Sequence, residues 1–255
     1  MKKLLLALLF FPTLVFANPI NDKCPQHVHW GAPEFSVKVE NIEYLCRTGY
    51  AVAYSNIHKN PLYVAEHVRK DRIGEEPRTE DFRIDPDIKP EHQATLQDYT
   101  GSGYDRGHMS PAANNGSNKQ AMSESFLLSN MVPQNPGNNR GIWKQLETYV
   151  RDWVVEGADL YVIQGAIYDE GHKNIGKNVA VPTRLFKVIV DPTNKRMLAF
   201  IFPNEKLEVK DLPKYAVSVQ KVEQETRIDF SPMIPGELKI LEVNDPDLKL
   251  WTKLH

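Results

Sequence analysis

Eighteen prolines, from Pro12 to Pro246, are scattered along this 255-residue chain, and they restrict its fold more than any other feature. A proline inside a helix removes a backbone hydrogen bond and clashes with the preceding turn, so a coiled coil is excluded. The remaining composition is that of a globular protein, with 41% hydrophobic and 25% charged residues. It argues against a disordered tail, a fibrous repeat or a disulfide-dense miniprotein, and the length suits one large domain or two small ones.

The charge balance gives no general sign of nucleic-acid binding. Lysines and arginines number 31 and acidic residues 33, a formal net charge of −2. Proteins that bind nucleic acids usually carry a basic surplus. Any site for a polyanion must therefore be a local basic cleft.

The first seventeen residues have the layout of a secretory signal peptide. Lys2 and Lys3 precede an apolar run from 4 to 16, and Ala17 is a small residue at a plausible cleavage point. The alternative is an uncleaved membrane anchor, for which the run is short. We therefore expect a signal peptide at 1–17, a secreted or periplasmic protein, and no membrane association after cleavage.

Cys24 and Cys46 are the only cysteines, and both follow the expected cleavage point. An oxidising compartment favours their pairing. We expect a Cys24–Cys46 disulfide, which by the chain-entropy estimate stabilises the fold by about 3 kcal/mol. Two cysteines are too few for a zinc site built from thiolates.

Hydrophobic periodicity predicts short strands and helices in one α+β domain, 18–255. The clearest helix is 140–156, in which Ile142, Leu146, Val150 and Trp153 share one face. Residues 19–48 are expected to be irregular, and the polar segment 69–104 to be a long loop of the kind that is often functional. The other expected elements are strands at 50–54, 62–65, 160–167, 184–190 and 197–202, and helices at 119–126 and 214–224.

The segment Asp105-Arg106-Gly107-His108 is the densest chemical signal. A neutral histidine can accept a proton near neutral pH, and an arginine fork suits phosphate oxygens. A structural role for the histidine is the common alternative. Asp105 is expected to make a structural ion pair or turn contact.

A second signal lies at the start of the predicted helix. Asn139 stands where an N-cap residue is expected, and capping is its ordinary interpretation. Glu147 lies at the rim of the apolar face with Arg151 one turn later, so a surface Glu147–Arg151 ion pair is the ordinary alternative there. Arg140 and Lys144 belong either to a solvated helix face or to a basic track.

Together these segments resemble the DNA/RNA non-specific endonucleases of the ββα-metal class. The resemblance covers roughly 48–235 and rests on the Asp-Arg-Gly-His core, followed about thirty residues later by an asparagine, with a tryptophan four and a glutamate eight residues beyond it. It implies a central antiparallel sheet with flanking helices and a ββα-metal active-site motif. It also implies a metal-dependent endonuclease of DNA and RNA.

The resemblance also implies roles for individual residues. His108 matches the general base, Asn139 the one protein ligand of the metal, and Glu147 the glutamate that holds the waters around the metal. Arg106 and Arg151 match arginines that face phosphate, and Arg140 is a further candidate for substrate binding. An upstream substrate arginine of some members matches either Arg78 or Arg83.

The chemistry agrees with these assignments. Mg²⁺, with Mn²⁺ as a substitute, accepts few protein ligands and acts as a Lewis acid on phosphoryl oxygens. The expected reaction is sequence- and sugar-non-specific hydrolysis of phosphodiesters to 5′-phosphate products. The rivals are a nucleic-acid-binding protein without catalysis and a phosphodiesterase for another substrate. Preference between DNA and RNA, a homodimer and a companion inhibitor stay open.

Overall fold

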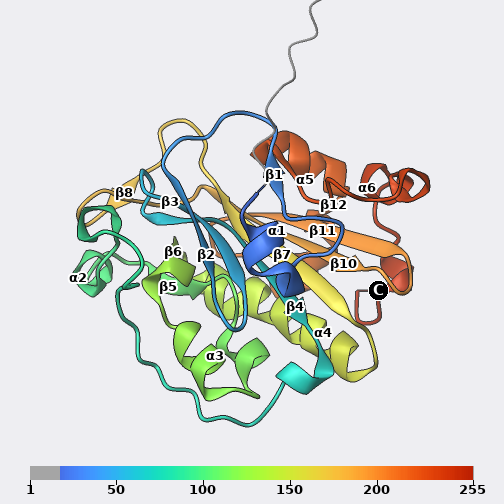
Figure 1. Cartoon of the computed structure of the whole chain (residues 1–255), viewed down its shortest axis with the longest axis horizontal. Coiled ribbons are helices and arrows are strands. Elements are labelled where there is room, and N and C mark those ends of the chain that lie inside the picture. The colour runs from blue at the N-terminus through green and yellow to red at the C-terminus, as the bar shows by residue number, and fades with distance from the viewer. Residues whose placement is uncertain (1–17, 255) are drawn as a thin grey trace, which may run out of the picture.

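The computed structural model describes residues 18–254, and its centre is a seven-stranded antiparallel sheet (Figure 1). Every neighbouring pair of strands in this sheet runs antiparallel. In spatial order the strands are β12 (Ala216–Val217), β11 (Arg196–Pro203), β10 (Arg184–Asp191), β7 (Leu160–Ile167), β4 (Asn60–Val68), β3 (Ala51–Ser55) and β2 (Ile42–Cys46). This confirms the predicted α+β class with a central antiparallel sheet.

The alternation of side chains along the strands creates two hydrophobic layers, one on each face of the sheet. In β10, Leu185 and Ile189 join the layer that contains Trp143, Leu146 and Val150. Phe186, Val188 and Val190 join the opposite layer, which contains Val219 and Val222 of helix α5 (Val219–Thr226) and Ile20 of helix α1 (Ile20–Lys23). Both faces are therefore covered.

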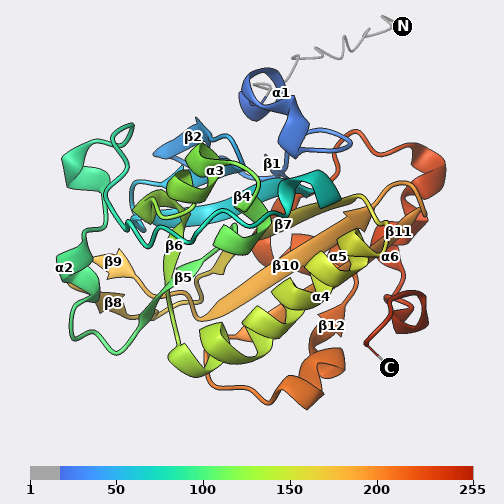
Figure 2. The ribbon, with the colours of Figure 1, turned by 90° about the horizontal axis from the view of Figure 1, so that it is seen from below.

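Helix α4 (Lys144–Val155) covers the first face and runs beneath the sheet in the view of Figure 2. Its buried residues are Leu146, Val150, Trp153 and Val154, the face that the periodicity predicts. A two-stranded ribbon, formed by β5 (Asp105–His108) and β6 (Met131–Gln134), precedes α4 in the chain. Ribbon and helix together position the residues singled out in the sequence.

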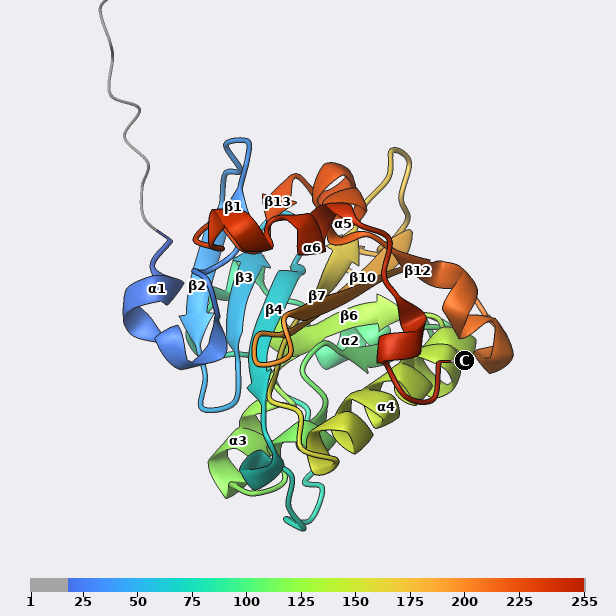
Figure 3. The ribbon, with the colours of Figure 1, turned by 90° about the vertical axis from the view of Figure 1, so that its right-hand side faces the viewer.

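The remaining elements are short. Two more two-stranded sheets pair β1 (Glu34–Phe35) with β13 (Ile228–Asp229) and β8 (Asn174–Ile175) with β9 (Val179–Ala180). The other helices are α2 (Leu96–Tyr99), α3 (Lys119–Glu124) and α6 (Ile240–Val243). In Figure 3, β13, α5 and α6 gather at one end of the molecule.

Three predicted elements differ from the structure. The helix expected from 140 begins only at Lys144, after a π-helical turn at Asn138–Trp143. The helix expected at 214–224 is instead a 3₁₀ segment (Val209–Tyr215), then β12, then α5. Helix α5 begins after Ser218 because this side chain accepts a hydrogen bond from the amide of Lys221 and caps it. The stretch 19–48, expected to be irregular, contributes α1, β1 and the edge strand β2.

The predicted Cys24–Cys46 disulfide is not formed in the structure, where both residues are free cysteines. The fold does bring them together: the thiols interact, and Cys46 Sγ donates to the carbonyl of Lys23 at 3.5 Å. Burial raises the pKa of the Cys24 thiol, and the neighbouring Cys46 raises it further. Because the thiolate is the reactive form, burial holds Cys24 in its unreactive state.

The predicted signal peptide, 1–17, lies outside the described residues. Within 18–254, no helix is both long enough and apolar enough to cross a bilayer.

Candidate active site

The β5–β6 ribbon presents Arg106 and His108 on one side, as residues two apart in a strand must be. Gly107 lies between them, packed against Gln134 of β6. A Cβ atom at position 107 would lie 2.1 Å from Gln134 Oε1 and 2.6 Å from its Cβ. Glycine is therefore required for the two strands to approach this closely.

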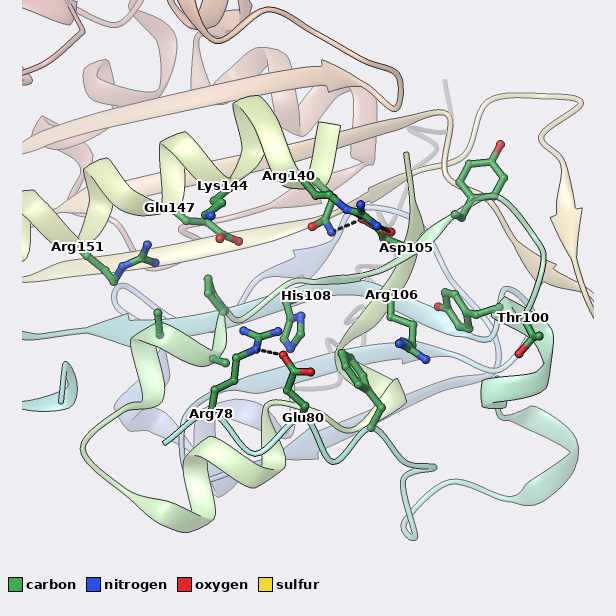
Figure 4. Close-up of a pocket in the computed structure, with 17 residues that line it drawn as sticks. Arg78, Glu80, Thr100, Asp105, Arg106, His108, Arg140, Lys144, Glu147 and Arg151 are labelled. Atoms are coloured by element: carbon green, nitrogen blue, oxygen red, sulfur yellow. Dashed lines mark hydrogen bonds and ion pairs between the residues drawn. The ribbon is translucent and has the colours of Figure 1, made fainter. Parts of the chain in front are cut away.

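His108 lies at the centre of the labelled side chains in Figure 4. Its ring packs edge-on against Phe82 and Phe126, with centroids 5.5 and 5.0 Å away. Burial, with Arg78 and Arg106 nearby, lowers the pKa of His108 to about 3. The imidazole is therefore neutral at physiological pH, and its Nε2 has no hydrogen-bond partner among the described residues.

Asn139 lies in a π-helical turn (Asn138–Trp143) that precedes α4. Gly141 breaks the helical geometry within this turn, with φ −107° and ψ −111°. Asn139 does not cap the helix, so the capping interpretation is wrong. Its Nδ2 donates to Asp105 Oδ2 at 2.9 Å, and this bond fixes the amide so that Oδ1 is the atom left for a ligand.

Asp105 holds two neighbours at once. Besides Asn139, it accepts two hydrogen bonds from Arg140, from Nε at 2.8 Å and from Nη2 at 2.6 Å. Burial works to raise the pKa of Asp105, but the bonds from Arg140 and Asn139 outweigh burial and hold it below its ordinary value. The predicted structural ion pair of Asp105 is thus confirmed, and the guanidinium of Arg140 is already engaged.

Glu147 enters the same space from the first turn of α4 (Figure 4). Burial raises the pKa of its carboxyl, an effect that the charges of Lys187 and Arg151 oppose. The ordinary alternative, a Glu147–Arg151 ion pair, is not formed. Arg151 instead donates to Asn114 Oδ1 at 3.3 Å and to Thr148 Oγ1 at 3.1 Å.

A buried polar cluster in the central sheet holds Arg151 in position. Glu66 of β4 is fully buried and accepts hydrogen bonds from Ser110, Asn114 and Gln164 at 2.8, 3.1 and 2.7 Å. Asn114, held by Glu66 through its Nδ2, offers its Oδ1 to Arg151. The position of Arg151 therefore depends on a carboxylate in the central sheet.

Arg106, His108, Asn139, Glu147 and Arg151 line one cleft of about 830 Å³. Five cations face it against three carboxylates, so the cleft is basic although the chain as a whole is slightly acidic. The cations are Arg78, Arg106, Arg140, Lys144 and Arg151, and the carboxylates are Glu80, Asp105 and Glu147. The structure thus brings together every site residue predicted from the sequence.

The structure also distinguishes the two upstream arginines, because one lines the cleft and the other does not. Arg78 lines the cleft, paired with Glu80 at 3.0 Å. Arg83 is bound to the Asp81 carboxylate at 2.7 Å and to the carbonyl of Ser123 at 2.9 Å, and it does not line the cleft. No local pattern in the sequence distinguishes them, because the path of the 69–104 loop decides which one faces inward.

Sequence reasoning missed three aromatic residues at the cleft: Phe82, Tyr99 and Tyr104. The guanidinium of Arg106 lies over the ring of Phe82, 4.2 Å from its centroid. Such a contact holds an arginine in place while its charge stays available. The spacing of these aromatics follows no strand or helix period, so they carried no signal.

Comparison with known proteins gives consistent results. The DNA/RNA non-specific endonuclease family matches residues 32–236. Mitochondrial nuclease EXOG from Danio rerio is 38% identical over 226 residues, 81% of this chain and 66% of that protein, and the human protein is 35% identical over 78% and 60%. Human mitochondrial endonuclease G is 34% identical over 76% of this chain and 72% of its own length.

A solved structure agrees. The chain resembles one from a crystal structure of the EndoG/EndoGI complex, described as showing the mechanism of EndoG inhibition. The TM-score is 0.73 at 29% identity, and the match covers 82% of this chain and 91% of that one. This chain spans less than two thirds of the length of the two EXOG nucleases.

The comparisons contradict one prediction. The chain was expected to be secreted or periplasmic, whereas EXOG from Danio rerio and human and human endonuclease G are all named as mitochondrial nucleases. That prediction is therefore wrong. It rested on 1–17 alone, a segment that lies outside the described residues.

Proposed function

Because the chain belongs to the DNA/RNA non-specific endonuclease family, we propose that residues 18–255 act as a single catalytic domain that hydrolyses phosphodiester bonds within DNA and RNA. The products carry 5′-phosphates. His108 is the general base, and Mg²⁺, for which Mn²⁺ can substitute, is the cofactor.

One observation carries this proposal: a neutral histidine, whose buried Nε2 makes no hydrogen bond with the described residues, lines a basic cleft beside an oriented asparagine. A general base must be unprotonated at working pH and within reach of the proton that it takes. Burial among Phe82 and Phe126 keeps His108 unprotonated, and the surrounding arginines attract the anionic substrate. The geometry thus supports attack on a phosphodiester.

The donor atoms fit a magnesium ion. Mg²⁺ prefers oxygen ligands, keeps several waters and takes few protein groups. Asn139 offers Oδ1 because Asp105 occupies its Nδ2, and Glu147 offers a carboxylate across the same cleft. When bound, the ion supplies Lewis-acid stabilisation of charge on the phosphoryl and leaving oxygens.

The protein's own groups account for the remaining requirements. His108 takes the proton of the attacking water, while Arg106 and Arg151 hold phosphoryl oxygens through guanidinium hydrogen bonds. Phe82 fixes Arg106, and Asn114 fixes Arg151. Of the two upstream arginines, Arg78 is the one that lines the cleft, where it is paired with Glu80 instead of standing free for phosphate.

The cleft also explains a lack of sequence preference. Contacts to phosphate position a nucleic acid but carry no base information. The groups assigned here, Arg106 and Arg151, are suited to phosphate rather than to base edges. DNA and RNA present the same phosphodiester, so both are substrates in this proposal.

The test is digestion of supercoiled plasmid and of total RNA by the purified full chain, with Mg²⁺ and with excess chelator. We expect both substrates to be degraded, and degradation to stop with chelator. His108→Ala should reduce the rate by about 10²–10⁴-fold, the usual contribution of a general base. His92→Ala, which changes a histidine outside the cleft, is the matched control and should cut normally.

Each other result has a definite meaning. An intact plasmid with folded, metal-replete protein would refute the endonuclease assignment. A gel shift without cutting would favour the binding protein instead. Normal cutting by His108→Ala would leave the nuclease in place but remove His108 as its base.

The solved relative in complex with EndoGI supports proposing that a protein inhibitor can bind this chain too. A basic cleft attracts acidic surfaces as it attracts nucleic acid. Association with a second copy remains a prediction, which light scattering on the purified chain can decide.

A further inference from the structure

Three carboxylates converge at the end of the molecule where α5, β13 and α6 meet (Figure 3), away from the cleft residues. They are Glu223 of α5, Asp229 of β13 and Glu242 of α6. One oxygen from each lies within 4.8 Å of the others. Three anions this close repel one another strongly unless something positive lies between them.

The protein supplies little compensation for this charge. Glu223 accepts a hydrogen bond from the amide of Phe230 at 3.0 Å, and Asp229 accepts one from the amide of Ser231 at 3.0 Å. Lys239 acts on the cluster electrostatically, but no lysine or arginine of 18–254 forms an ion pair with any of the three. Lys221 of α5 pairs with Glu225 instead.

Two buried polar atoms beside the cluster make no hydrogen bond of ordinary geometry with the described residues. Glu242 is only 5% exposed, and its Oε1 makes no hydrogen bond with any described residue. Ser231 is 1% exposed, lies next to the Glu242 carboxyl, and its hydroxyl makes no hydrogen bond of ordinary geometry. Buried polar atoms almost always have partners, so this pair indicates a missing ligand.

We propose that Glu223, Asp229 and Glu242, with the Ser231 hydroxyl, form a structural Ca²⁺ site. Calcium takes roughly six to eight oxygen ligands in flexible geometry, and several of them can be carboxylates. Magnesium demands near-ideal octahedral geometry and keeps several waters, so it usually takes only about one or two carboxylates. Three carboxylates from three separate elements therefore suit calcium.

The site has a structural consequence for the C-terminal part of the chain. Helix α6 has four residues, too few to be stable alone, and among its residues only Glu242 is buried. A cation shared with α5 and β13 would fasten α6 to the layer that covers the second face of the sheet. The site is independent of catalysis.

The same carboxylates could instead share a proton. Burial, and after it the charge of Glu223, raises the pKa of Glu242 to about 7. A proton shared between carboxylates would relieve the same repulsion without a metal. This is the outcome that the experiment must separate from calcium binding.

The experiment is thermal unfolding of the full chain at pH 8 with increasing Ca²⁺, in the Asn139→Ala background that removes the proposed cleft metal ligand. We expect the melting temperature to rise with Ca²⁺, and isothermal titration calorimetry to detect one site. Adding Glu242→Gln or Asp229→Asn should abolish both signals. Glu237→Gln, an exposed glutamate just before α6, is the matched control and should preserve them.

A melting temperature that ignores Ca²⁺ in the Asn139→Ala chain would overturn the proposal. So would a calcium response that survives both Glu242→Gln and Asp229→Asn. If Ca²⁺ has no effect and Glu242→Gln stabilises the chain at pH 8, the cluster holds a proton rather than a metal. If Glu242→Gln fails to fold, Asp229→Asn and the calorimetry still decide.

Discussion

If ion pairs with Asp105 and Glu80 keep two of the five cleft cations away from phosphate, the salt dependence of DNA affinity should correspond to three cation–phosphate contacts. Arg140 and Arg78 are paired with these carboxylates. Arg106, Lys144 and Arg151 form no ion pair with any residue of 18–254. Each phosphate that a cation neutralises releases counterions, which sets the slope of affinity against salt.

The magnitude follows from that count. Three contacts give a slope of log affinity against log salt of about −2.7 on duplex DNA, a loss of about 40-fold between 50 and 200 mM salt. Five contacts would give about −4.5 and a loss of about 500-fold. The two cases are well separated.

Fluorescence anisotropy with a labelled 20-base-pair duplex measures this slope, with chelator present to prevent cutting. Arg106→Ala should bring the slope to about −1.8, whereas Arg140→Ala should leave it unchanged. Lys214→Ala, an exposed lysine outside the cleft, is the control. A wild-type slope near −4.5 would refute the reasoning, because it would mean that the carboxylates release their arginines to DNA.

Three further predictions concern the supports of the site and the fold. Asp105→Ala should raise the Mg²⁺ concentration for half-maximal cutting about 10–100-fold, since it frees the Asn139 amide; an unchanged requirement in a metal titration would contradict this. Glu66→Ala should lower the free energy of unfolding in urea by about 3–5 kcal/mol, since three buried donors lose their acceptor; a loss below about 1 kcal/mol would count against it. Burial lowers the pKa of His27 to about 4, so the folded state disfavours its protonation. The free energy of unfolding therefore carries no penalty from His27 above pH 6.5 and falls by up to about 3 kcal/mol toward pH 4. His27→Gln should weaken this pH dependence of the free energy of unfolding, measured in urea between pH 4 and 6.5. An equal pH dependence in both proteins would exclude His27 as the cause.

Local patterns in the sequence predicted the parts of the fold that depend on local physics. The strand at 160–167 coincides with β7, and the apolar face of 140–156 is the buried face of α4. Both signals come from periodic burial, which a single sequence displays directly. The edge strand β2 was not predicted, because an edge strand is half exposed and its alternation of apolar and polar residues is weak.

The candidate site was predicted as a set of residues but not as an arrangement. The resemblance identified His108 and Asn139, yet a regular helix from 140 gave no hint of the π-helical turn around Gly141. The bond from Asn139 to Asp105 joins residues 34 positions apart. Contacts of that range depend on how the ribbon and α4 meet, which no local pattern records.

Helix α1 packs in the hydrophobic layer on the second face of the sheet, whereas α4 and the cleft belong to the first (Figure 2). The chain therefore enters α1 behind the sheet. An affinity tag, a fluorescent carrier or a bead attached there leaves the cleft facing outward. Immobilised through that end, the protein keeps its basic cleft accessible to polymers far larger than itself.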